Sequence, residues 1–123
     1  AMLNYGQNMS RNRLHNAQEQ LARAKLALLT LFDEVDLLAT PPAPQLAFAR
    51  TQSVPTNQAI FTGLANICEG PAISLPSGIS GEGLPLGFHL MAAPYEEAHL
   101  LNVAEDLEHL WGRFLPPVPS SHT

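Results

Sequence analysis

Residues 66–92 read NICEGPAISLPSGISGEGLPLGFHLMA, and this stretch carries the strongest structural signal in the chain. It contains two short apolar segments, Ala72–Leu75 and Leu86–Met91, separated by the glycine-rich segment Gly78–Gly83. Short apolar runs bounded by glycine and proline are typical of strands joined by a turn. We therefore predict a hairpin-like pair of strands. The first should end at Pro76, because proline cannot donate a hydrogen bond to a sheet ladder.

The flanking segments add a third strand and three helices. Val35–Thr40 is short, apolar apart from one aspartate and followed by prolines, which predicts a buried strand. Apolar side chains recur every three or four residues in three segments, which predicts amphipathic helices over Ser10–Glu34, Thr56–Cys68 and Tyr95–Trp111. Ser10 or Asn12 is suited to cap the first helix, Thr56 the second, and Gly112 is suited to end the third.

This order of elements predicts an α/β fold with a partial mixed sheet of about three strands flanked by helices. The first two strands are joined through a helix and should therefore run parallel. A sheet this narrow has at least one bare edge, which favours pairing with another chain unless something covers it. The chain reads as a slice of a larger sheet.

The 123 residues are enough for one small domain. We place this domain at residues 10–115, between a flexible N-terminal segment, 1–9, and a disordered tail, 116–123, that is rich in proline and serine. The first thirteen residues lack the apolar core of a signal peptide, and the longest apolar run, Leu26–Phe32, is too short to cross a bilayer.

Charge and cysteine content exclude several classes of function. The net charge is −5, and the six basic residues are spread along the chain, so we expect no nucleic-acid binding. Cys68 is the single cysteine, which excludes an intrachain disulfide and fits a reducing cytoplasm. His99 and His109 are too far apart on their predicted helix to share a metal ion. We expect no metal and no cofactor.

The pair PAISLP and GLPLGFHLM, together with VDLLATPPAP at residues 35–44, resembles the C-terminal region of the amidase signature family. Its members hydrolyse amides or transfer amide nitrogen with a Ser–cis-Ser–Lys triad and a Gly/Ser-rich loop that binds the oxyanion. The resemblance covers roughly residues 10–111 and implies a chain that lacks the catalytic part. The residue inventory agrees, because Lys25 is the only lysine and Ser120–Ser121, in the tail, is the only Ser-Ser pair.

Two residues are candidates for the substrate-pocket wall of a complete enzyme. Glu69 stands where the family pattern usually has a small residue, often glycine, and a carboxylate there would favour cationic or hydrogen-bond-donating substrates; a solvated loop glutamate is the alternative. His89 stands where the family more often has glutamine. It lies between Phe88 and Leu90, so it should point to the opposite face of its strand, in a hydrogen-bonding role rather than a catalytic one.

Three interpretations follow. The first is a C-terminal portion of an amidase-like protein, from an amide C–N hydrolase or amidotransferase lineage, not catalytic as an isolated chain. The second is a stand-alone, self-associating, non-enzymatic remnant of an amidase. The third is a small independent hydrolase that uses Cys68 or His89, which with Asp36 could form a Cys–His–acid set. We disfavour it because Cys68 is expected to be a buried, inert thiol and His89 a hydrogen-bonding residue. Lys25 is expected to be a solvated surface lysine, so the family triad is not assembled either. The expected partner is a second copy or the missing amidase half.

Overall fold

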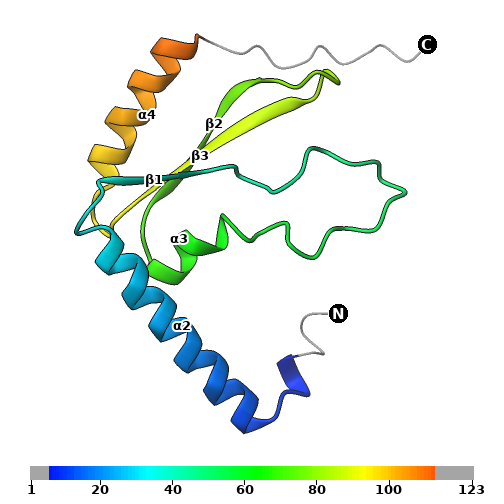
Figure 1. Ribbon diagram of the computed structural model, residues 1–123, viewed down its shortest axis with the longest axis vertical. Coiled ribbons are helices and arrows are strands. Elements are labelled where there is room, and N and C mark those ends of the chain that lie inside the picture. The colour runs from blue at the N-terminus through cyan, green and yellow to red at the C-terminus, as the bar shows by residue number, and fades with distance from the viewer. Residues whose placement is uncertain (1–5, 113–123) are drawn as a thin grey trace.

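The computed structural model describes residues 6–112, and three helices of this region pack around a three-stranded sheet (Figure 1). The elements follow the chain in the order α2 (Arg11–Leu31), β1 (Leu37–Thr40), α3 (Gly63–Cys68), β2 (Ala72–Ile79), β3 (Pro85–Ala92) and α4 (Glu97–Trp111). The predicted α/β class is confirmed. The predictions for residues 1–5 and for the tail 116–123 lie outside the described residues.

The strands are arranged in the order β1-β3-β2, with β3 in the centre and antiparallel to both neighbours. β1 and β2 therefore run in the same direction, as predicted, but they are not neighbours. The predicted mixed sheet is wrong in this respect, because the pairs found in the described part of the chain are all antiparallel. β3 turns straight back on β2, and β1 pairs with the other edge of β3 rather than with the free edge of β2.

β2 continues through Pro76 as far as Ile79, so the prediction that Pro76 ends this strand is wrong. Two features allow the proline: β2 is an edge strand, and its register with β3 shifts between Pro76 and Gly78. The turn is correspondingly shorter than predicted. Ser80 closes it, because its backbone N–H donates to the Leu84 carbonyl at 2.8 Å and its hydroxyl accepts from the Leu84 N–H at 3.1 Å.

The first and last helices match their predictions within three residues at each end. The Ser10 hydroxyl caps α2 by accepting from the Arg13 N–H at 3.4 Å. Gly112 ends α4 with a φ of 80°, and its N–H donates to the Glu108 carbonyl. Val35 and Asp36 precede β1, which begins at Leu37.

The predicted helix Thr56–Cys68 is wrong over its first half, because α3 begins only at Gly63. Residues 56–62 form turns, in which the Ile60 N–H donates to the carbonyl of Asn57, three residues back. Ile60 is exposed, so this half lacks the packed apolar face that stabilises a helix in a protein.

Each face of β3 packs against different helices. On one face Met91 packs against Ala65 and Cys68 of α3, with partly buried leucines of α2 around them. On the other face Leu90 and Ala92 pack against Leu100 of α4. This division follows from the alternation of side chains along a strand.

α2 is only partly used by this core. None of its residues is buried, and Figure 1 shows its N-terminal half projecting away from the sheet. Leu14 and Leu21 on this half are 49% and 53% exposed. Within residues 6–112, no helix combines the length and the apolar character that crossing a membrane requires.

Candidate functional site

Glu69 directly follows α3 and has a left-handed backbone conformation, with a φ of 58°. Its N–H donates to the carbonyl of Ala65, which closes the last turn of the helix. Glycine adopts this conformation without the steric cost that a Cβ brings, which explains why a helix end of this kind favours glycine. The backbone conformation of Glu69 therefore belongs to the way in which α3 ends, and the charge of its side chain plays no part in it.

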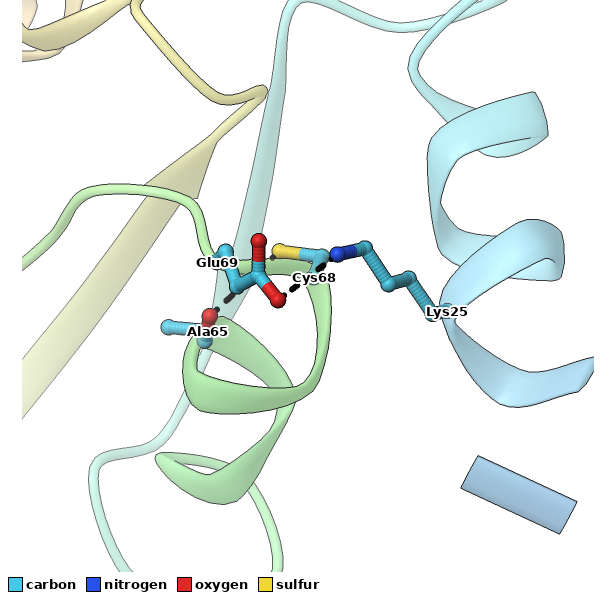
Figure 2. Close-up of polar contacts among 4 residues, drawn as sticks. All are labelled: Lys25, Ala65, Cys68 and Glu69. Carbon is cyan, nitrogen blue, oxygen red and sulfur yellow. Dashed lines mark hydrogen bonds and ion pairs between the residues drawn. The ribbon is translucent and has the colours of Figure 1, made fainter. Parts of the chain in front are cut away.

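The Glu69 carboxylate forms an ion pair with Lys25 of α2, with Nζ and Oε1 2.8 Å apart (Figure 2). The glutamate side chain is 75% exposed and that of the lysine 35%. Lys25 is expected to be a surface lysine, and its side chain is partly exposed; that expectation does not include the contact of its ammonium with the end of α3. The pair joins two elements that are more than forty residues apart in the sequence.

An open groove of about 430 Å³ lies beside this pair. We call it the α2–α3 groove, and its lining residues are Leu21, Ala22, Lys25, Asn66, Ile67 and Glu69. Its apolar lining comes from both helices, and the ion pair lies at its border. The negative charge that Glu69 presents to this groove is offset by the positive charge of Lys25. Glu69 would therefore attract a cation in the groove only as far as Lys25 leaves its carboxylate uncompensated.

Cys68 is fully buried, and its Sγ is 3.6 Å from the Ala65 carbonyl, toward which Figure 2 shows it directed. It packs against Met91 in the core. The sequence-based interpretation of Cys68 as a buried thiol agrees with this position.

His89 is buried on β3, with 3% of its surface exposed. Its Nδ1 shares a hydrogen bond with the Thr40 hydroxyl of β1 at 3.0 Å. Burial lowers the pKa of His89 below its usual value of 6.5, because the charged ring would lose its hydration. The ring is therefore neutral at pH 7 and can both donate and accept a hydrogen bond.

The register of the sheet places Thr40, His89 and Ser74 in one row across the three strands. This row lies on the face of Met91 and opposite Leu90, as the alternation predicted for His89 requires. A hydroxyl bonded to an imidazole is also the geometry of a nucleophile and its base. Within the described residues, however, no carboxylate hydrogen bond orients the ring, so the pair lacks the third group of a catalytic triad.

The structure does not join Cys68, His89 and Asp36 into a catalytic set. The thiol contacts the Ala65 carbonyl, the imidazole bonds Thr40, and the exposed Asp36 lines a separate pocket beside the start of α4. Glu69 and His89 also have different partners. The described region contains no group of three or more residues that could hold a metal ion, and Ser120–Ser121 lies outside it.

Sequence reasoning missed the partners of both candidate residues. Thr40 ends an apolar strand directly before two prolines, which gave no signal that its hydroxyl would face a histidine 49 residues away. Lys25 is the single lysine of the chain, and nothing in the sequence around it indicated that its ammonium would pair with Glu69.

The family model described as Amidase matches residues 2–101. The A-type subunit of glutamyl-tRNA(Gln) amidotransferase from Brucella ovis is 38% identical over 89 residues, which are 67% of this chain and 18% of that protein. The protein of the same name from Parvibaculum lavamentivorans is 43% identical over 83 residues, 63% of this chain and 17% of its own length. The chain thus spans less than a fifth of the curated relatives it matches.

Solved structures of amidotransferase and amide-hydrolase proteins also resemble this chain over only part of their own length. The corresponding A-type amidotransferase protein of Thermotoga maritima superposes with a TM-score of 0.71 at 27% identity, over 77% of this chain and 22% of its own. A 6-aminohexanoate cyclic dimer hydrolase with bound substrate superposes with a TM-score of 0.70 at 25% identity, over 91% of this chain and 27% of its own. A protein from a vestigial complex related to s-triazine catabolism gives a TM-score of 0.81 over 92% of this chain and 27% of its own, and its 21% identity shows the fold alone.

Proposed function

This chain belongs to the amidase family, and we propose that it supplies sheet strands and part of the pocket wall of an amide C–N hydrolase or amidotransferase, without the catalytic groups. We place it at the C-terminal end of that fold. The family reaction needs a serine nucleophile, a neutral lysine base within hydrogen-bond reach and preorganised oxyanion donors. The proposal rests on one observation: the only lysine of the chain, Lys25, is held by a carboxylate at 2.8 Å.

This observation matters because, within residues 6–112, the Lys25 ammonium is paired with a carboxylate and not with the serine hydroxyl that the family triad requires. A catalytic lysine and its serines would therefore have to come from polypeptide outside this sequence.

Glu69 and His89 are our proposed wall residues. His89 is neutral, bonded to Thr40 and only 3% exposed, so its second ring nitrogen would reach an amide substrate only if the complete enzyme uncovers this part of the sheet, in the manner of the glutamine that the family more often has there. Glu69 would favour a cationic substrate group only in competition with Lys25. Both roles require the remainder of the enzyme to close the pocket.

A broad fluorophosphonate serine probe followed by intact-mass spectrometry tests the absence of an activated nucleophile. We expect no adduct on the purified chain, beside a full-length amidase that is labelled under the same conditions. The Thr40→Val variant is the matched control, because it removes the one hydroxyl that the structure places on an imidazole. A stoichiometric adduct on wild type would overturn the proposal, and its loss in Thr40→Val would assign the nucleophile to Thr40.

The proposed location is a reducing compartment such as the cytoplasm, supported by the presence of a single cysteine, which is buried. The proposed partner is the remainder of an amidase or a second copy. The amidotransferase relatives are subunits by their own names, which supports a role within an assembly.

A further inference from the structure

The exposed half of α2 carries a continuous stripe of basic and apolar residues. Arg11, Leu14, Gln18, Leu21 and Lys25 follow one another at intervals of three and four, which puts them along one side of the helix. The two leucines are half-exposed, although packing of an apolar face is what normally stabilises a helix. The described residues leave this stripe open over its N-terminal half.

The α2–α3 groove extends the stripe at its C-terminal end, since Leu21 and Lys25 belong to both. Leu21, Ala22 and Ile67 make its apolar lining. This groove is a suitable receptor for one aliphatic side chain presented by another helix, the common mode in which an amphipathic helix docks.

The charge of α2 limits what can cover it. The helix holds four of the six basic residues of the chain, two of them on the stripe, and a single acidic residue, Glu19, although the whole chain carries a net charge of −5. The expectation that the basic residues are spread along the chain is therefore wrong. Most of the positive charge of the chain is on α2, a helix with no buried residue. A covering surface with an excess of carboxylates is favoured by Coulomb attraction and steered to it.

α4 carries such a surface. Glu97, Leu101, Glu105 and Glu108 follow at intervals of four, four and three along one side, and all four are exposed. Leu101 is 57% exposed, and α4 contains no lysine or arginine. The helix packs on the sheet through another side, which contains the buried Leu100 and Ala104.

We propose that the stripe on α2 and the α2–α3 groove bind the acidic row on α4 of a second copy of this chain, with Leu101 seated in the groove. Residues 11–25 and helix α4 both span fifteen residues, about 22 Å at 1.5 Å per residue. With the helices antiparallel and Leu101 opposite Leu21, Glu97 falls opposite Lys25 and Glu108 opposite Leu14, one turn from Arg11.

Each copy carries both surfaces, so the same contact can close a two-fold dimer or extend a chain of copies. Glu69 at the groove does not repel the acidic row as a bare carboxylate would, because Lys25 lies 2.8 Å from it. The inference rests on the proposed function in one respect, since it assigns a surface to the second copy named there as a partner, and it fails or holds whether or not the chain has a nucleophile.

Sedimentation equilibrium of the full chain at about 0.05 M and about 0.5 M salt tests the contact, because screening grows roughly threefold over this range. We expect concentration-dependent association that weakens at high salt. Leu101→Ala should raise the dissociation constant about tenfold, as expected for an anchor in an apolar pocket. A wild-type chain that stays monomeric at about 100 µM, where Kd values in the micromolar range would give association, overturns the proposal and assigns the stripe to another polypeptide.

A charge exchange locates the contact. Arg11→Glu and Glu108→Arg should each weaken association several-fold, and an equimolar mixture of the two variants should restore it, because each then meets a complementary surface. Asp106→Arg is the matched control: it reverses a charge on α4, one residue from Glu105 but on a different side of the helix. Equal weakening by the control, or no recovery in the mixture, would overturn the proposed interface; far-UV circular dichroism verifies that each variant folds.

Discussion

At the scale of single residues, the end of α3 shows two local preferences in conflict. A left-handed backbone favours glycine, and the side chain at this position is a glutamate whose carboxylate meets Lys25. The left-handed conformation costs a residue with a Cβ about 1–2 kcal/mol. An ion pair this exposed returns about 0–1 kcal/mol. The backbone cost therefore equals or exceeds the gain, and Glu69 is not explained by stability alone.

Substitutions at Glu69 separate these two terms. We expect Glu69→Gly to be more stable than Glu69→Ala by about 1 kcal/mol, because both lose the ion pair and only glycine relieves the backbone. Urea unfolding of the two variants measures the difference. Lys25→Met is the control for the ion pair alone and should lower stability by no more than about 1 kcal/mol. A Glu69→Gly variant less stable than Glu69→Ala would show that the carboxylate outweighs the backbone.

The buried His89 makes stability depend on pH. Its pKa is lowered in the folded chain, so the unfolded chain binds its proton more readily. Stability therefore falls as the pH drops below about 6.5 and through the folded pKa. We expect wild type to lose more stability than His89→Gln between neutral and mildly acidic pH, since glutamine can keep a hydrogen bond to Thr40 without a charge.

Urea unfolding across that pH range, with His99→Gln as a control, tests this prediction. His99 is exposed, so its replacement is a matched control that removes a histidine without removing a buried ring. Identical pH profiles for wild type and His89→Gln would contradict the role given to burial of the ring.

At the scale of elements, the connection between α3 and β2 is fixed by a close approach of two backbones. A Cβ placed on Gly70 would collide with the Ala92 carbonyl oxygen of β3 and come within 3.0 Å of the Cys68 Sγ. The Gly70 N–H also donates to the Ala65 carbonyl at 3.1 Å. A side chain at this position would push α3 away from the sheet, and with it the core around Met91.

Gly70→Ala should therefore lower the free energy of unfolding by about 1–3 kcal/mol, the usual range for overpacking against a rigid neighbour. Gly63→Ala is the matched control, because a Cβ there meets nothing within 4 Å and alanine favours helix. We expect Gly63→Ala to equal or exceed wild type in urea unfolding. Similar losses at both glycines would show that the contact with Ala92 is not the cause.

At the scale of the whole molecule, buried apolar packing is concentrated around β3 and decreases along α2 toward its N-terminus. Both core clusters include residues of β3, whereas α2 adds only partly buried residues from its C-terminal end. A helix half with no packed face opens at low free-energy cost.

Hydrogen exchange should report this gradient. We expect amides of residues 11–23 to exchange far faster than those of β3 in a dilute, high-salt sample, and to gain protection at high concentration and low salt if α4 of a second copy covers them. Mass-spectrometric exchange of peptides from the two elements measures it. Equal protection of both elements in the dilute sample would contradict the gradient.

The sequence by itself determined the element types, the bounds of α2 and α4 within three residues, the family, and the absence of a second lysine. The element types and bounds follow from local periodicity and capping residues, which act within a few positions of the chain. The family follows from the resemblance of residues 35–44 and 66–92 to known members. Only the tertiary structure decided the strand order β1-β3-β2, the passage of β2 through Pro76, and the partners of His89 and Lys25. The physical reason is that pairing and burial depend on residues far apart in the sequence, and an edge strand accepts a proline that a central strand would reject.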